Sequence, residues 1–295
     1  MTHTAQTFAE SQPQVEKARP LAVRPWLATG TLCQREWVRF VRQRNRVVGA
    51  IGQPIIFWLL FGAGLGPTFR LAGDEAARVS YREYFFPGSL ILILLFTAIF
   101  ATISIIEDRR EGFLQSVLVA PIPRWSMVLG KVLGGSLIAM VEGTVFLALG
   151  LTLGVHFTPL MIGEIVALLA VISLALTSLG FVIAWRMDST QGFHAIMSIF
   201  LMPMWLLSGA FFPPPPLVAS TSWTQWGLSL VMQANPLTYG VAGLRRLLYS
   251  NVADPPLSPD TPPLAICWAV TIVFALVMFA LAWKISEQRT TGDLL

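Results

Sequence analysis

Long apolar runs divide this chain into segments that can each cross a lipid bilayer. Spanning ~30 Å of hydrocarbon takes about 20 mostly apolar residues, and several runs reach that length. We place these runs at Val47–Gly66, Tyr84–Ile106, Val132–Val155, Ile165–Ala184, Ala195–Phe212 and Leu264–Trp283. The pattern predicts an all-α polytopic membrane protein with six transmembrane helices.

The segment before the first run has two faces at helical spacing. One side carries the arginines and the other the apolar residues: Arg35, Arg39, Arg42 and Arg46, against Cys33, Trp37, Phe40 and Val41. We expect an amphipathic interfacial helix over 25–46, lying in the headgroup plane of the membrane lipids, after a disordered tail over 1–24. Either a positively charged anchor or a dedicated contact for a partner explains this helix.

A dense charge cluster, Glu107 to Glu111, directly follows the second run. Apolar residues then recur on one helical face: Phe113, Leu114, Val117 and Leu118. Pro121 and Pro123 disfavour helical geometry before them, so the helix should end near Ala120. The loop 107–126 therefore holds a short amphipathic helix, whose mixed charges favour a protein groove over anionic lipid.

The region 213–262 is apolar but too broken for a clean span. A proline run follows the fifth apolar run, and Asn235-Pro236 interrupts the rest. We expect two short re-entrant helices in the outer leaflet, with Trp223, Trp226 and Tyr239 at headgroup depth. A seventh span is the alternative, although it would place the basic C-terminal end outside.

Composition supports the membrane class. Of the 295 residues, 55% are hydrophobic and only 12% are charged, about half the roughly 25% of a soluble domain. The formal charge of +4 does not indicate nucleic-acid binding, because the 20 Lys and Arg residues flank the apolar runs. Most of the Lys and Arg residues fall on one side of the membrane in the predicted topology, and this excess predicts that both termini are cytoplasmic. The exceptions are Arg70, Arg78, Arg82, Arg245 and Arg246.

The chain offers little catalytic chemistry. Its histidines and cysteines lack the spacing of a metal site: His3, His156, His194, Cys33 and Cys267. A membrane enzyme has only His194 and Ser198 in its favour. The pair Gly130-Lys131 precedes Val132, so it is no phosphate-binding loop. We therefore expect no enzyme activity, no cofactor and no metal.

A few residues stand out inside the predicted spans. Glu142 is an ionisable group in mid-span, which indicates either a translocation path or subunit contact, or a hydrogen bond to a neighbouring helix. Met202 and Trp205 suggest an adaptable apolar path, with packing as the alternative. Glu164 is read as a helix cap. Two G-x-x-x-G pairs, Gly130/Gly134 and Gly150/Gly154, allow close helix approach.

Three stretches resemble a known family. EDRREGFLQSVLVAPIP, followed by Gly130-Lys131, is similar to the signature of type-2 ABC exporter permease subunits, the drug-resistance, Nod-factor and polysaccharide export group. LLSGAFFPPPP (Leu206–Pro216) and NPLTYGVAGLR (Asn235–Arg245) fit in order and spacing. The resemblance covers nearly the whole chain, 25–46 and the permease domain 47–295 included. At Gly112–Gln115 the chain departs from relatives, which often carry Gly-Thr and a Glu near the Leu.

This resemblance implies a membrane subunit of an ATP-driven exporter in the cell (inner) membrane. Two copies of a separate ATPase subunit would contact two permease subunits, and the substrate would be amphipathic, lipid-like or drug-like. The implied ATPase-coupling residues are Glu107, Asp108, Arg109, Arg110, Glu111, Phe113 and Leu114, with Arg35 and Arg39 of the interfacial helix. An ion- or proton-coupled secondary transporter is the competing class. Such proteins often show internal repeats, and this sequence has no convincing one.

Overall fold

The computed structural model describes residues 24–65, 80–215, 222–252, 255, 257–258 and 260–288. This part of the chain is all-helical, without a strand. In chain order its helices are α1 (Pro25–Arg42), α2 (Arg44–Gly64), α3 (Tyr81–Arg110), α4 (Phe113–Val119), α5 (Arg124–Leu147), the 3₁₀ segment η1 (Ala148–Leu153), α6 (Pro159–Trp185), α7 (Thr190–Trp205), the π-helical turn η2 (Leu206–Ala210), α8 (Trp223–Ala234), α9 (Pro236–Leu248) and α10 (Leu264–Glu287).

The six predicted spans are confirmed. The helices long and apolar enough to cross a membrane are α2, α3, α5 with η1, α6, α7 with η2, and α10. Several extend beyond the predicted ends, as α3 does at both, because polar caps and charged residues continue the helix past the apolar run. The predicted tail lies outside the described residues apart from Arg24.

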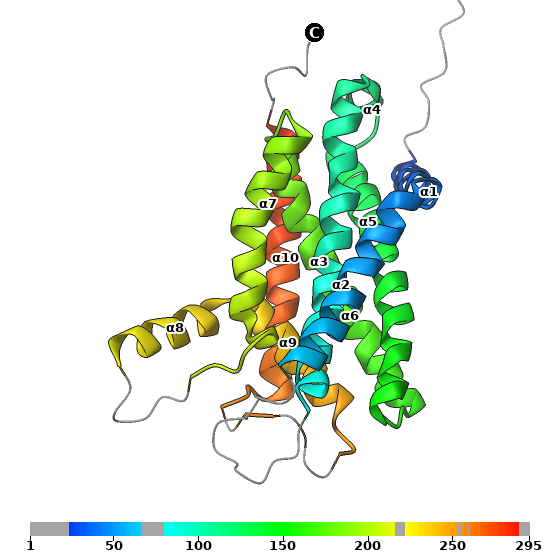
Figure 1. Cartoon of the computed structure of the whole chain (residues 1–295). Helices are drawn as coiled ribbons and strands as arrows, with labels where there is room; N and C mark the ends of the chain where they lie inside the picture. The colour runs from blue at the N-terminus through cyan, green and yellow to red at the C-terminus, as the bar shows by residue number, and fades with distance from the viewer. Residues whose placement is uncertain are drawn as a thin grey trace, which may run out of the picture.

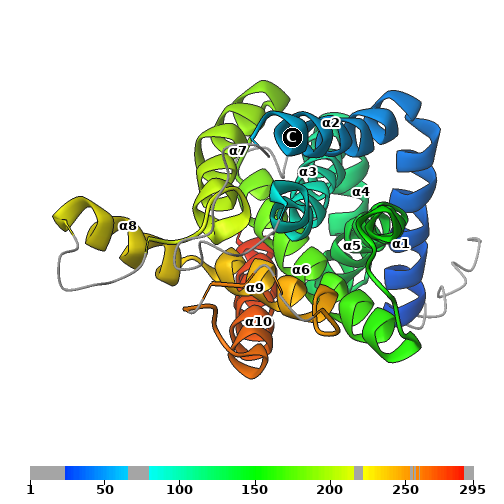
Figure 2. The ribbon, with the colours of Figure 1, turned by 60° about the horizontal axis from the view of Figure 1, so that its bottom comes forward.

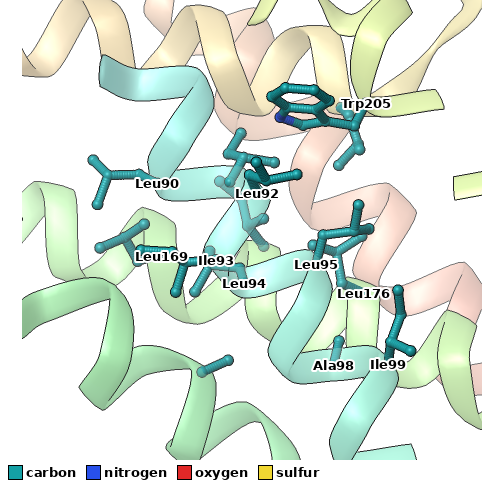
Figure 3. Close-up of a cluster of buried hydrophobic side chains, with 14 of the residues drawn as sticks. Leu90, Leu92, Ile93, Leu94, Leu95, Ala98, Ile99, Leu169, Leu176 and Trp205 are labelled. Atoms are coloured by element: carbon teal, nitrogen blue, oxygen red, sulfur yellow. The ribbon is translucent and has the colours of Figure 1, made fainter. Parts of the chain in front are cut away.

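Helix α3 is the centre of the bundle. In its most apolar window 89% is buried within the protein, against 17% for α10 and 18% for α2. It packs against α2, α5, α6 and α7, which surround it in Figure 2. Figure 3 shows its leucines and isoleucines meeting Leu169 and Leu176 of α6 and Trp205 of α7. The less buried helices are left to face lipid or another subunit.

The two ends of the bundle differ. Helix α4, the α6–α7 connection and the last residues of α10 lie at the upper end in Figure 1, and α8 and α9 lie at the lower end. The two short helices expected within 213–262 are present as α8 and α9. Helix α9 packs against α10, α6 and η2, whereas α8 projects sideways (Figure 1). With 12 and 13 residues, neither is long enough for a seventh span.

A proline near the start of α3 leaves one backbone carbonyl without its helical partner, and Tyr249 at the end of α9 donates a hydrogen bond to it. Ser80 and Glu83 form a capping box at this end. Pro87 lacks the N–H that would bond the carbonyl of Glu83, and the hydroxyl of Tyr249 donates to that carbonyl at 2.7 Å. Burial raises the pKa of Tyr249, so this hydroxyl keeps its proton and remains a donor.

We expect Tyr249→Phe to lower the free energy of unfolding by about 1–3 kcal/mol, because it leaves the half-buried Glu83 carbonyl, which also lacks its helical partner, unsatisfied. Tyr239→Phe is the matched control, since the Tyr239 hydroxyl donates to Gln233 O at an exposed position, and should cost about 0.5 kcal/mol or less. Thermal unfolding of both variants in detergent measures the difference. Equal losses would show that the bond to Glu83 stabilises nothing.

Two smaller predictions are wrong. Helix α6 begins at Pro159 with Thr158 as its cap, whose hydroxyl accepts from Met161 N at 3.3 Å. Glu164 therefore lies beyond the first turn, exposed, and does not cap the helix. Gly154 does not mediate helix contact either: it ends η1 with φ of 72° and a Cβ there would meet nothing within 4 Å.

Candidate functional site

The charge cluster at the end of α3 divides its contacts among three directions. Glu107 and Asp108 face α1, Arg109 and Arg110 face the α6–α7 connection, and Glu111 is largely exposed, with one carboxylate oxygen 3.5 Å from Arg39 of α1. This division follows from the helix, since successive residues on it point about 100° apart. The cluster therefore joins elements that are distant in sequence.

Asp108 is the centre of the contacts with α1. Its carboxylate is fully buried and accepts two hydrogen bonds from Arg35, at 2.7 and 3.0 Å. Arg39 donates to the same carboxylate at 2.6 Å and to Glu107 at 2.8 Å. Bidentate arginine–carboxylate pairs are among the stronger charged contacts in proteins. The sequence predicts that Arg35 and Arg39 lie on the polar face of α1. In the structure this face is turned toward α3.

A buried lysine completes the group, and the sequence reasoning missed it. Lys131 of α5, only 2% exposed, donates to Asp108 at 2.5 Å and to Glu36 at 2.9 Å. Glu36 is the one acidic residue of α1, and that isolated acid on a basic helix was the available signal. We name Arg35, Glu36, Arg39, Glu107, Asp108 and Lys131 the ionic cluster.

The formal charges of the ionic cluster compensate one another. Burial lowers the pKa of Arg35, but hydrogen bonding to Asp108 and the negative charges around it outweigh burial and raise that pKa overall. Arg35 therefore stays protonated at any physiological pH. The two arginines, the lysine and the three carboxylates balance one another, which is how charges are tolerated in a buried place.

Helix α1 sits on α5 through glycines. A Cβ at Gly130 would lie 2.8 Å from both Leu32 Cβ and Thr29 O, and one at Gly134 would lie 2.6 Å from Glu36 Cβ. This confirms the first G-x-x-x-G pair as a place of close helix approach.

The buried face of α1 is Thr29, Leu32, Glu36 and Phe40. Cys33 and Trp37 are half-buried and Val41 is exposed, so the buried face is rotated from the predicted one. Helix α1 also ends at Arg42, before the predicted boundary at residue 46.

Arg109 and Arg110 fasten α3 to the connection between α6 and α7. Arg109 donates to Trp185 O at 2.6 Å and to Met187 O at 3.1 Å. Arg110 donates to Asp188 O at 3.2 Å. The carbonyls at the end of α6 lack partners within their own helix, and the arginines supply them. The end of α3 is therefore bound to the end of α6 and the α6–α7 connection as well as to α1.

Helix α4 turns away from α3 at Gly112, which has φ of 76°. Residues other than glycine adopt this left-handed conformation at a cost. Phe113 lies under Arg35, with 3.7 Å between the guanidinium carbon and the ring centroid. Leu114 is buried, whereas Glu111 is 61% exposed at its side chain and Val119 is 84% exposed. The exposed side chains here are Glu111, which precedes α4, and Ser116 and Val119 of α4, with Phe113 at their edge; we call this surface the outer face of α4.

Glu142 has a hydrogen-bond partner on the central helix. Thr97 of α3 donates to one carboxylate oxygen, and the other oxygen has no partner within the described part of the chain. Glu142 also lines a groove of about 460 Å³ between α1, α2 and α5. The groove is otherwise apolar apart from Arg44, and its volume suits a small ligand.

Met202 and Trp205 lie apart from that groove. Trp205 is 2% exposed and donates its indole N–H to Gly88 O at 2.9 Å. Met202 is half-buried and packs against the same core. The structure gives both a packing role and does not bring them near Glu142.

Several known proteins are similar to this chain in sequence. The pattern of the ABC-2 type transporter family matches residues 28–249. The inner membrane transport permease YadH of Escherichia coli K12 is 24% identical over 273 residues, 89% of this chain and 96% of that protein. The putative transport permease ycf38 of Cyanophora paradoxa is 26% identical over 225 residues, 75% of this chain and 73% of that protein.

A further relative has a name that refers to nodulation. Nodulation protein J of Rhizobium leguminosarum bv. viciae is 28% identical over 171 residues, 57% of this chain and 63% of that protein. The family match covers more than half of the chain, including α1, α3, α4 and α9. The helical bundle with its six candidate spans agrees with such a protein. The chain therefore belongs to the ABC-2 type transporter family and is a multi-pass membrane permease of that family.

Proposed function

We propose that this chain is the transmembrane subunit of an ATP-driven exporter whose hydrolysis occurs on a separate ATPase. One observation carries the proposal: the end of α3 connects the short helix α4 to α1, α5 and the end of α6 through charged contacts. A push on α4 would therefore move several membrane helices together. Membership of the ABC-2 type transporter family supports this proposal over the ion-coupled alternative.

We assign the ATPase contact to the outer face of α4. Glu111, Phe113, Ser116 and Val119 present a mixed polar and apolar surface there. Asp108 and Leu114 are buried, so we assign them to positioning α4. Arg35 and Arg39 orient α1 beside α4, and Arg109 and Arg110 hold the α6–α7 connection.

The proposed arrangement places α4 and both termini in the cytoplasm and α8 and α9 at the outer leaflet. The excess of Lys and Arg near the α4 end supports this orientation. Trp223 and Trp226 of α8 are 89% and 51% exposed, as expected of aromatic residues at headgroup depth. The protein would lie in the cell membrane.

Two permease subunits and two ATPase subunits form the proposed complex. Apolar side chains are exposed on α2 and α10, such as Leu60 and Leu276. These helices can therefore contact lipid or a second copy of the chain. The apolar groove beside Glu142 supports an amphipathic, lipid-like or drug-like substrate taken from the cytoplasm or inner leaflet. ATP that binds the closed ATPase pair more tightly than the open pair would shift the permease between its two orientations.

Co-purification tests the ATPase contact. We expect Glu111→Lys with Phe113→Ala to abolish co-purification with an ATPase encoded beside this chain, because the pair reverses a charge and removes the ring next to Arg35. The control is Glu164→Lys with Phe200→Ala, two exposed positions away from α4. Membrane insertion should be unchanged in both. Full co-purification of the α4 variant would refute the assigned contact face.

A further inference from the structure

A second pocket lies at the end of the bundle opposite α4. It has a volume of about 300 Å³ and lies between η2, α8, α9 and the segment before α10. In Figure 1 these elements meet at the lower end. Its lining is mixed rather than apolar, and the charged residues on its walls are Arg245 of α9 and Asp260. In the proposed orientation this pocket faces outward.

Arg245 is a buried cation that has no carboxylate partner in the part of the chain that the structure describes. The residue is 4% exposed, and one guanidinium nitrogen donates to Tyr84 O at 3.2 Å and to Gly209 O at 3.0 Å. The guanidinium carbon lies 4.1 Å from the centroid of the Tyr84 ring. The Nε atom is buried without a hydrogen-bond partner, and within the described residues no carboxylate pairs with the side chain.

Carbonyl oxygens and an aromatic ring do not neutralise such a charge. Removing an ion from water costs several kcal/mol, and the usual compensation is an opposite charge nearby. The cationic groups of the ionic cluster at the other end have carboxylates, whereas Arg245 has none among the described residues. An anionic group entering the pocket would supply the missing partner.

The other polar groups of the pocket are one carboxylate and several neutral groups. The hydroxyl of Ser208 uses its proton on Trp205 O, and that of Thr238 uses its proton on Met232 O, so their lone pairs remain. The Gln233 amide donates one N–H to Ser229 Oγ and keeps a second. Asp260 adds an exposed carboxylate. The pocket therefore holds one buried cation and one exposed carboxylate among neutral polar groups, and a ligand that carries both an anionic and a cationic group matches it better than a simple anion.

We infer that this pocket binds a zwitterionic headgroup, with a phosphate or carboxylate at Arg245 and an ammonium group beside Asp260. The headgroup belongs to an amphiphile, whose apolar part lies toward α8 and the membrane. This inference deepens the proposed export function by naming a substrate class and an outward-facing binding site. Binding itself requires only the permease, so the ATPase contact is tested separately.

Calorimetric titration of the full chain in non-ionic detergent tests the inference. The probes are glycerophosphoethanolamine, β-alanine, glycerol phosphate and ethanolamine, which carry phosphate with ammonium, carboxylate with ammonium, phosphate alone and ammonium alone. We expect saturable binding of a zwitterion and about tenfold weaker binding of either single charge, a difference of about 1.4 kcal/mol. Whichever zwitterion binds more tightly identifies the anionic group.

Two variants locate the site. Asp260→Asn alters an exposed residue, so it should fold normally and remove the preference for glycerophosphoethanolamine over glycerol phosphate. Arg245→Gln should lose the binding of both, whereas Arg186→Gln, at an exposed position of the opposite end, should retain it. Absence of zwitterion binding to the unmodified chain would overturn the inference. So would an unchanged preference in Asp260→Asn, which decides the matter even if Arg245→Gln fails to fold.

Discussion

Asp108→Asn should lower the free energy of unfolding by about 3–5 kcal/mol, the cost of removing one partner from a buried ion pair. Asp108 is fully buried and receives hydrogen bonds from Arg35, Arg39 and Lys131. An asparagine would leave these three cations with fewer negative charges and would direct its own N–H groups toward them. Thermal or denaturant unfolding in detergent measures the loss.

Asp188→Asn is the matched control for this prediction. The Asp188 side chain is 88% exposed and lies 3.7 Å from Arg109, so its loss should change the stability by about 0.5 kcal/mol or less. Adding Lys131→Met to Asp108→Asn removes one unbalanced cation and should recover part of the stability. Comparable losses in Asp108→Asn and Asp188→Asn would show that the ionic cluster contributes nothing to folding.

Gly130→Ala is expected to displace α1 from α5. The new methyl group would lie 2.8 Å from Thr29 O and from Leu32 Cβ, and the nearby backbone leaves it little room. Overpacking of this kind costs about 1–3 kcal/mol. Because α1 carries Arg35, which contacts Asp108 and Phe113, ATPase co-purification should weaken together with stability.

Cys33 reports the displacement of α1 directly. Burial, with a smaller contribution from Glu36, raises the pKa of this thiol, so maleimide should label it slowly in the unmodified protein. In a Cys267→Ser background, Gly130→Ala should speed the labelling, because a displaced α1 exposes the thiol. Gly163→Ala, where a Cβ meets nothing within 4 Å, should leave labelling and co-purification unchanged. Equal labelling rates would contradict the close approach at Gly130.

The helices and their order were predictable because each apolar run is long and its neighbours carry turn residues or charges. The positions of α4, α8 and α9 followed from prolines that stop helices. The partners of Glu107 to Glu111 were not predictable, since a helix pattern gives directions but not the neighbour in each direction. Lys131 directly precedes the predicted span from Val132, where a lysine is expected to be exposed, and the carboxylates of Glu36 and Asp108 explain its burial.

Residues with polar side chains in the spans were harder still. The sequence marked Glu142 as unusual, but its bond to Thr97 depends on how α3 and α5 are rotated about their axes. The contacts of Arg245, outside the spans in α9, were hidden as well, because its partners are backbone carbonyls, one in α3 and one in η2. Backbone groups released by kinks have no signature in a hydropathy pattern.

Helix α3 holds the ionic cluster near one end and the carbonyls that bind Arg245 and Tyr249 near the other. At 1.5 Å per residue, its 30 residues span about 45 Å. One continuous helix therefore joins the cytoplasmic and outer faces in the proposed orientation. Tilting it changes both faces in the same instant, so widening one while narrowing the other requires no relay of side-chain rearrangements through the bilayer.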